Sequence, residues 1–325
     1  RIGAKTLSLY ICTTMLAISL SLVIGYILNP GEGVNINLEN TQLKINEAPS
    51  FFTVLLGIIP ENPFKSLSEG NMLQVIFFAL ILGGCLSNLK DNKNLLNFFN
   101  GMNELVLKML SVLMIIAPIG IFCLISKTFA TQGLSSILEL LKYFLGVVLV
   151  IFTHFLIVYI PLVRFLGRIS IKSFLSGIKQ IALFAFSTSS SSATIPITLQ
   201  NLNKNFNVKS KISSFTVPLG ATINMDGTAI MQGMATIFIA NIYNIDLLLS
   251  DYLSIILTAT LASVGTAGVP GVGIIMLGMV LNQVGLPLEG IAVVIGVDRL
   301  LDMLRTSLNV SGDAMVTLIV NKTEK

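Results

Sequence analysis

The sequence predicts an all-α membrane protein whose chain crosses the bilayer several times. Hydrophobic residues make up 54% of the 325 residues and charged residues only 11%, whereas soluble proteins carry about 25% charged residues. The apolar stretches approach or exceed the roughly 20 residues that a helix needs to span a membrane. Short charged or Pro/Gly/Asn-containing breaks separate them, unlike the alternation of a membrane β-barrel, with its strands of roughly ten residues.

The first half of the chain divides into apolar runs and breaks. Asn29, Pro30 and Gly31 end the first run, and Pro60, Pro63 and Gly70 interrupt the second, because these residue types terminate or bend helices. The elements expected up to residue 163 are a span over 6–28, an exposed loop over 31–48, one interrupted helix made of 49–59 and 71–89, and spans over 95–130 and 134–163.

Basic residues on both sides of segment 180–202 predict that it enters and leaves the membrane on the same side. They are Arg164, Arg168, Lys172 and Lys179 before the segment, and Lys204, Lys209 and Lys211 after it. Basic loops stay in the cytoplasm, so residues 171–202 are expected to form a re-entrant hairpin. Its tip would be the small, polar run 187–196, which ends in proline.

A second hairpin is expected over 248–285. No Lys or Arg occurs between Lys211 and Arg299, so both flanks of this segment are expected outside the cell. Its middle, residues 265–273, is too rich in Gly and Pro to remain helical. Two hairpins that enter from opposite sides predict an inverted repeat, with binding sites where the broken helices meet.

The last span, 286–321, carries polar residues at membrane depth. Asp298, Asp302, Arg305, Asn309 and Asp313 fall on one stripe of a helix. A charge near the bilayer centre costs about 3 kcal/mol, so such a stripe requires partners, water or ligands. The stripe is therefore expected to form the site toward which both hairpin tips point.

The chemistry of this site leaves alternatives open. Arg305 suits a carboxylate and Asp302 an ammonium group, unless the two neutralise each other at i,i+3. Asp226, in the interrupted span 212–241, suits a small cation, or it pairs with an arginine at a kink. The serine tip fits an anion-binding turn or a linker. The glycine tract fits a lid or close helix packing.

Acidic residues outnumber basic residues in the apolar spans near this site, and the chain has a single histidine. Four aspartates, at 226, 298, 302 and 313, exceed Arg299 and Arg305, which predicts bound cations. His154 is expected to be a packing residue, and no function is assigned to it. The net charge of +4 fits basic cytoplasmic loops and gives no reason to expect nucleic acid as a partner.

Four motifs in order resemble the dicarboxylate/amino acid:cation symporters, the family of glutamate and aspartate transporters. They are SSSSATIP (189–196), NMDGT (224–228), GTAGVPG (265–271) and DRLLDMLRTSLNVSGD (298–313). The resemblance runs along the whole chain, which would then begin at the family's third span. It implies a homotrimer with an elevator mechanism, in which residues 1–29 and 134–325 form a transport domain and 30–133 a scaffold.

The resemblance also implies roles for individual residues. Arg305 would bind the side-chain carboxylate of the substrate and Asp302 its amino group. The remaining substrate-binding residues would be Ser189, Ser190, Ser191, Met225, Thr228, Val269, Gly273, Thr306 and Asn309. Three sodium sites would be formed by Asp313 with Gly220, Asn224 and Asn309; by Tyr10, Thr13, Thr14, Asn224 and Asp226; and by Thr222, Ser263, Val264 and Thr266.

The leading hypothesis is a transporter of the bacterial inner (plasma) membrane, and not an enzyme, that couples sodium influx to uptake of L-aspartate or L-glutamate. Asp302 beside Arg305 favours an acidic amino acid, and the retained Asp226 and Asp313 favour sodium. Some relatives carry an arginine just before the serine run, where this chain has Thr188 or Ser189; Arg299 is the candidate for the equivalent charge. The alternatives are a proton-coupled glutamate or C4-dicarboxylate symporter and, from another class, an anion-conducting channel.

Overall fold

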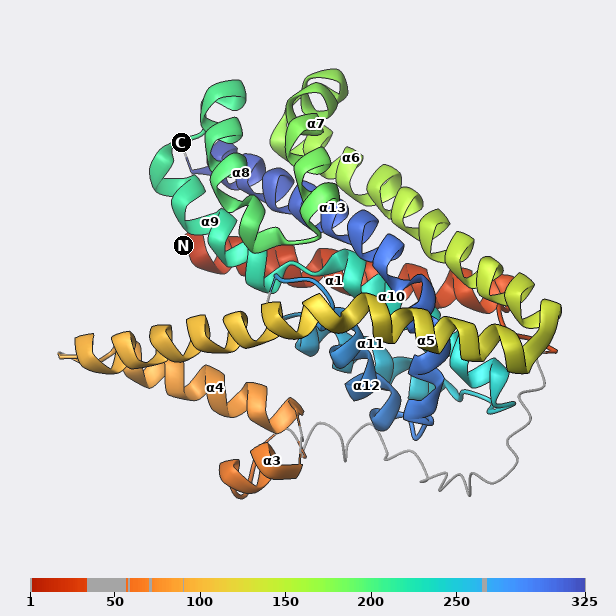
Figure 1. Ribbon diagram of the computed structural model, residues 1–325. Helices are drawn as coiled ribbons and strands as arrows, with labels where there is room; N and C mark the ends of the chain where they lie inside the picture. The colour runs from red at the N-terminus through yellow and green to blue at the C-terminus, as the bar shows by residue number, and fades with distance from the viewer. Residues whose placement is uncertain are drawn as a thin grey trace. The chain divides into compact units, whose positions relative to one another are not determined.

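The computed structural model describes residues 2–33, 57, 59–69, 72–89, 91–264 and 268–324. Every regular element in these residues is a helix, which confirms the all-α prediction for them (Figure 1). The chain forms two compact units, one made of Arg1–Pro49 and Leu134–Lys325 and the other of Ser50–Gly133. Their assignment as transport domain and scaffold stays a prediction.

The smaller unit contains α3 (Pro63–Glu69), α4 (Met72–Ser87) and the first part of α5 (Lys93–His154). Helix α4 lies inside the expected run 71–89, whereas most of 49–59, like 34–50, falls outside the described residues. Helix α3 is unexpected. Pro63 begins it instead of breaking the chain, because a first-turn proline needs no N–H partner, and Asn62 Oδ1 accepts from the N–H groups of Phe64 and Lys65.

The break expected between the spans 95–130 and 134–163 is absent, while Leu138–Gly167 is long and apolar enough to cross a membrane, as the second span predicts. Helix α5 runs through residues 131–133 without a break, because the single Gly133 costs a helix only about 1 kcal/mol. The irregularity comes later. Two π-helical turns, η1 (Phe155–Tyr159) and η2 (Val163–Gly167), flank α6 (Ile160–Leu162). Pro161 lies between them and has no N–H for a regular helical bond.

The larger unit holds the remaining helices. They are α1 (Ile2–Leu28), α7 (Ile171–Thr188), α8 (Ser191–Phe206), α9 (Ser210–Ile223), α10 (Asp226–Ile242), α11 (Leu249–Val264), α12 (Val272–Gln283), the 3-10 turn η3 (Leu288–Gly290) and α13 (Ile291–Thr323). The pairs α7/α8 and α11/α12 pack together where the two hairpins are expected, and we call them the first and second hairpins. Whether they are re-entrant stays a prediction.

Helices α10 and α13 form the centre of the larger unit. Every residue of α10 except Asn241 is buried, as is the whole of 308–320 in α13. Helix α13 packs against α7, α8, α9, α10 and α12, and α1 packs along α10 (Figure 1). A helix buried on all sides lies in a core, so the polar residues of α10 and α13 must find their partners inside the protein.

Two helical stretches in the described residues are long and apolar enough to cross a membrane. They are Ile2–Leu28 and Leu138–Gly167, fewer than the sequence predicts. The second exposes large apolar side chains such as Leu149, Phe152 and Leu156, which suits contact with lipid or with another protein surface.

Candidate functional site

The tips of the two hairpins touch each other. The first tip is Ser189–Ser190, between α7 and α8; the described part of the second is 268–271, before α12. Ser190 Oγ donates to the Gly268 carbonyl at 2.8 Å, and the Ser192 N–H donates to the same oxygen at 3.1 Å. A Cβ at Gly268 would lie 2.5 Å from the Ala221 carbonyl oxygen, so only glycine fits between the tips and the end of α9.

The stripe on α13 faces these tips with a buried ion-pair network. Arg305 is 0% exposed; its Nη2 donates to Asp302 Oδ1 at 3.0 Å, and Nη1 lies 2.8 Å from Asp298 Oδ1. The latter contact is close enough for an ion pair but not aligned for a hydrogen bond, so Arg305 Nη1 and Nε and Asp298 Oδ1 have no hydrogen-bond partner in the described residues. The Gly271 N–H of the second tip donates to Asp302 Oδ2 at 3.3 Å.

Arg299 does not belong to the interior, so the expected charge count needs correction. Its side chain is 47% exposed and reaches only to 4.0 Å from Asp302. Within the described residues, the buried arginine at this site is therefore Arg305 alone, against buried Asp226, Asp298 and Asp313. Three buried aspartates against one buried arginine leave the same excess of two negative charges as expected, and cations are still needed to balance it.

A small cavity lies where the tips meet α10 and α13. Its volume is about 20 Å³, room for about one water molecule. It is lined by Gly268 and by nine of the predicted substrate-binding residues, which are Ser189, Ser191, Met225, Thr228, Val269, Gly273, Asp302, Thr306 and Asn309. The other two adjoin it: Ser190 holds the tips together, and Arg305 Nη2 lies 3.6 Å from a Cβ placed at Gly273.

The first predicted sodium set converges on Asp313, which is 1% exposed. Asn224 Nδ2 donates to Asp313 Oδ1 and to the Asn309 carbonyl, each at 2.9 Å. A Cβ at Gly220 would overlap Asp313 Oδ1 and lie 2.5 Å from the Tyr10 hydroxyl, so these groups crowd together. The buried Asn224 Oδ1 has no hydrogen-bond partner in the described residues.

The second set is brought together only in part. Thr14 Oγ1 donates to Asp226 Oδ1 at 2.6 Å, and Thr13 Oγ1 lies 3.4 Å from the same oxygen. The Tyr10 hydroxyl instead donates to the Thr216 carbonyl at 3.1 Å, beside Asp313. Asp226 Oδ2 accepts from the Tyr159 hydroxyl at 2.8 Å and lies 3.2 Å from His154 Nε2.

The third set is the least assembled. Thr222 is exposed and its hydroxyl donates to the Leu219 carbonyl, while the Ser263 hydroxyl donates to Thr260. Val264 is the last residue of α11, and Thr266 falls outside the described residues. In the described part of this region, no hydrogen bond joins Thr222 to Ser263 or Val264.

Sequence reasoning missed two residues of the site. His154 is more than a packing residue, because it contacts Asp226, which lies 72 positions away. Tyr159 was not selected at all. It lies five positions after His154, and in an α-helix this spacing would turn the two side chains about 140° apart. Only the π-turn puts them together, and no sequence pattern in this chain points to that turn.

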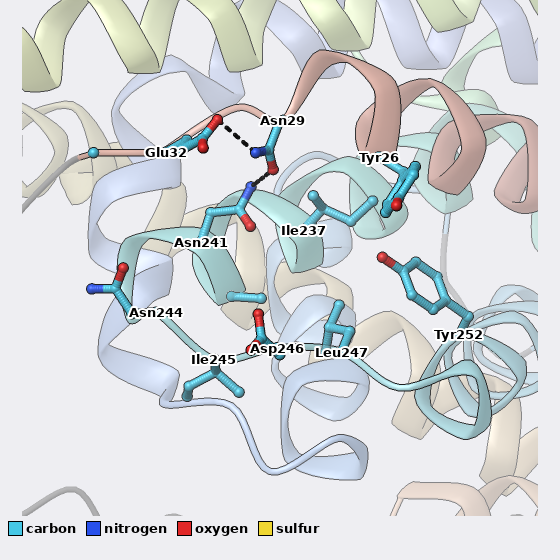
Figure 2. Close-up of a pocket in the computed structure, with 12 residues that line it drawn as sticks. Tyr26, Asn29, Glu32, Ile237, Asn241, Asn244, Ile245, Asp246, Leu247 and Tyr252 are labelled. Atoms are coloured by element: carbon cyan, nitrogen blue, oxygen red, sulfur yellow. Dashed lines mark hydrogen bonds between the residues drawn. The ribbon is translucent and has the colours of Figure 1, made fainter.

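A larger pocket lies elsewhere, where α1 and α10 end and α11 begins. Its volume is about 530 Å³, and Tyr26 and Tyr252 face each other across it (Figure 2). Asn29 Nδ2 donates to Glu32 Oε2 at 2.7 Å, and Asn241 Nδ2 to Asn29 Oδ1 at 2.8 Å. None of its lining residues belongs to the predicted site. Its volume alone does not identify a ligand, so we assign it no function.

Comparisons with known proteins agree with the resemblance. A family model, the sodium:dicarboxylate symporter family, matches residues 1–323. The chain is 35% identical to the proton/sodium-glutamate symport protein of Geobacillus stearothermophilus over an alignment 333 residues long, which covers 100% of this chain and 79% of that protein. It is 35% identical to the proton/glutamate-aspartate symporter of Escherichia coli K12 (100% and 76% covered) and 32% identical to excitatory amino acid transporter 1 of Ambystoma tigrinum (98% and 70%). The chain therefore belongs to the sodium:dicarboxylate symporter family.

Proposed function

We propose that this chain is a secondary transporter, and not an enzyme, that couples sodium influx to the uptake of L-aspartate or L-glutamate. One observation carries the proposal: Arg305 is fully buried beside the cavity between the hairpins, its Nε has no hydrogen-bond partner in the described residues, and its Nη1 has only the ion-pair contact with Asp298. Unmade hydrogen bonds of a buried charge are costly. A substrate carboxylate would supply them.

The neighbouring groups favour an acidic amino acid over a plain dicarboxylate. Asp302 borders the cavity and faces Arg305, so one helix turn presents a guanidinium and a carboxylate together. A substrate with a carboxylate for Arg305 and an ammonium group for Asp302 would replace their mutual ion pair. A C4-dicarboxylate without an amino group would leave Asp302 uncompensated. Two of the relatives named above are a proton/sodium-glutamate and a proton/glutamate-aspartate symporter, which supports the same class.

The surroundings of Asp313 favour sodium as the coupling ion. Carboxylate, amide and main-chain oxygens are the ligands that hard cations prefer, and Asn224 Oδ1 is a buried acceptor without a donor among the described residues. Asp226 already has several donors, whereas in the described residues Asp313 accepts a side-chain hydrogen bond from Asn224 alone. We therefore assign the stronger need for a cation to Asp313.

The cavity of about 20 Å³ is too small for an amino acid, so binding requires the tips to separate. The second hairpin is the proposed lid, because its tip is held by two hydrogen bonds at Gly268 and one at Gly271. In the proposed elevator mechanism, both hairpins are re-entrant and residues 1–29 and 134–325 move against a scaffold, 30–133, in a homotrimer of the full-length protein. As a member of a transporter family the chain is a membrane protein, and the bacterial inner membrane is the proposed location.

Uptake by the full-length protein in liposomes tests this function. We expect saturable accumulation of L-aspartate or L-glutamate driven by an inward sodium gradient, with succinate a poor competitor. Accumulation driven by a proton gradient alone would show that protons, and not sodium ions, are the coupling ions. Flux that never exceeds equilibrium would identify a channel and overturn the proposal.

Substitutions at Arg305 sharpen the test. Arg305→Cys is expected to abolish uptake of acidic amino acids. Arg305→Lys keeps a charge beside Asp298 and Asp302, so it should fold, yet bind poorly because lysine lacks the planar fork. Arg164→Cys, at an exposed arginine in η2, is the matched control and should transport normally. Retained aspartate uptake in folded Arg305→Cys protein would refute the role of this residue.

A further inference from the structure

The carboxylate of Asp226 is shared between two helices. Its Oδ1 faces α1, where Thr14 and Thr13 lie at 2.6 and 3.4 Å. Its Oδ2 faces the end of α5 and the π-turn η1, where His154 Nε2 and the Tyr159 hydroxyl lie at 3.2 and 2.8 Å. All four partners and Asp226 itself are buried. Oδ1 therefore faces the predicted sodium ligands Thr13 and Thr14, whereas Oδ2 is held by His154 and Tyr159.

A π-turn makes this arrangement possible. The Ile160 N–H donates to the Phe155 carbonyl, a bond across five residues that widens the helix. His154 and Tyr159, also five residues apart, consequently lie on the same face, with their rings 5.0 Å apart and edge to face. In a regular α-helix one of the two would point away from Asp226. Such turns cost helix regularity and are frequent at functional sites.

The donor directions are fixed by the acceptor. An ionised carboxylate can only accept hydrogen bonds, so Tyr159 donates its hydroxyl and His154 donates from Nε2. His154 Nδ1 is buried and has no hydrogen-bond partner in the described residues. In the described residues, the contact with Asp226 is therefore the one polar contact of the His154 ring. A residue that only fills space would not need this contact.

We propose that His154 and Tyr159 are positioning residues for sodium: they clamp Asp226 Oδ2 so that Oδ1 and the Thr13 and Thr14 hydroxyls present a fixed set of oxygens to the ion. The proposal rests on the proposed sodium coupling. It adds the segment 154–159 to a site otherwise built from α1 and the α9/α10 break. Neither residue would touch the ion. Partners of this kind orient the ligands of a metal, and their loss typically costs about 10–100-fold in metal affinity.

Sodium-dependent binding of aspartate to the purified full-length protein tests the clamp. Tyr159→Phe removes one hydroxyl and should raise the sodium concentration at half-maximal effect by about tenfold or more. Aspartate affinity extrapolated to saturating sodium should not change, since neither residue borders the substrate cavity. A general packing defect would not separate these two quantities.

Two further variants and a control complete the test. His154→Gln can still donate from a nitrogen near Nε2 and should recover most of the sodium affinity that His154→Leu loses. Tyr143→Phe is the matched control: Tyr143 is a buried tyrosine on α5 whose hydroxyl has no hydrogen-bond partner in the described residues, so it should bind sodium normally. If His154→Leu does not fold, Tyr159→Phe decides alone.

The outcomes separate the clamp from the transport function. Wild-type binding that ignores sodium would overturn sodium coupling itself. Wild-type binding that needs sodium, combined with an unchanged or lower sodium midpoint in Tyr159→Phe, would overturn the clamp and leave the transport function standing. Sodium-induced thermal stabilisation without aspartate provides a second readout, and Tyr159→Phe should need about tenfold more sodium there too.

Discussion

Removing the Ser190 hydroxyl should weaken substrate binding by loosening the contact between the hairpin tips. The hydroxyl accepts from the Ala193 N–H, capping α8, and donates to the Gly268 carbonyl. Loss of the cap costs about 1 kcal/mol whether the tips touch or not. Loss of the bond to Gly268 costs about 1 kcal/mol only in the closed state, since that carbonyl keeps the Ser192 N–H. We expect aspartate to enter while the tips are apart and the bond to re-form when they close over it, so Ser190→Ala should bind aspartate about fivefold more weakly.

Ser170→Ala is the control for this substitution. Ser170 caps α7 in the same hairpin, accepting from the Ser173 N–H at 3.2 Å, and in the described residues it makes no contact with the second tip. Calorimetric titration with aspartate at saturating sodium, alongside thermal denaturation, distinguishes the two effects. Both variants should lose similar stability, and only Ser190→Ala should lose affinity. Equal affinities in Ser190→Ala and wild type would show that closure does not depend on this bond.

Two further predictions concern the interior. Gly227→Ala should destabilise the protein by several kcal/mol or prevent folding, because its Cβ would lie 2.7 Å from the Arg305 main chain. Thermal denaturation measures this loss. Gly101→Ala is the control: no atom lies within 4 Å of its Cβ, so it should be neutral or stabilising in the same assay. Asp313→Asn removes a buried charge and should raise the melting temperature in sodium-free buffer while reducing the stabilisation that sodium gives. Asp226→Asn should lower the melting temperature in both buffers, because the one carbonyl oxygen of an amide cannot accept from Tyr159 and His154 on one side and from Thr14 on the other. The opposite ranking would contradict the assignment of the stronger cation need to Asp313.

Patterns along the chain were enough to predict the helical class and the polar stripe on α13. Residues spaced 4, 3, 4 and 4 apart share a helix face whatever the tertiary structure. The break before Asp226 was also predictable, because charge and glycine together are costly in an apolar helix. These features are local, and their physics can be read within one helix.

Features that depend on distant contacts could not be predicted in this way. The continuity of α5 reflects the absence of any strong breaker between its two apolar parts, which hydropathy alone does not reveal. The exposure of Arg299 depends on which face of α13 turns outward near its start. The meeting of His154 with Asp226 depends on a local change of helix period and on a fold that joins segments 72 residues apart.

Asn309 serves both halves of the site. Its side-chain oxygen accepts from the Gly227 N–H at 2.7 Å, its carbonyl accepts from Asn224, and its side chain also borders the small cavity. A substrate that contacts the Asn309 side chain in the cavity therefore contacts a group that is hydrogen-bonded to the segment carrying Asn224 and Asp226. Such coupling is reciprocal. If bound sodium raises the affinity for an amino acid through Asn309 by some factor, the bound amino acid raises the affinity for sodium by the same factor.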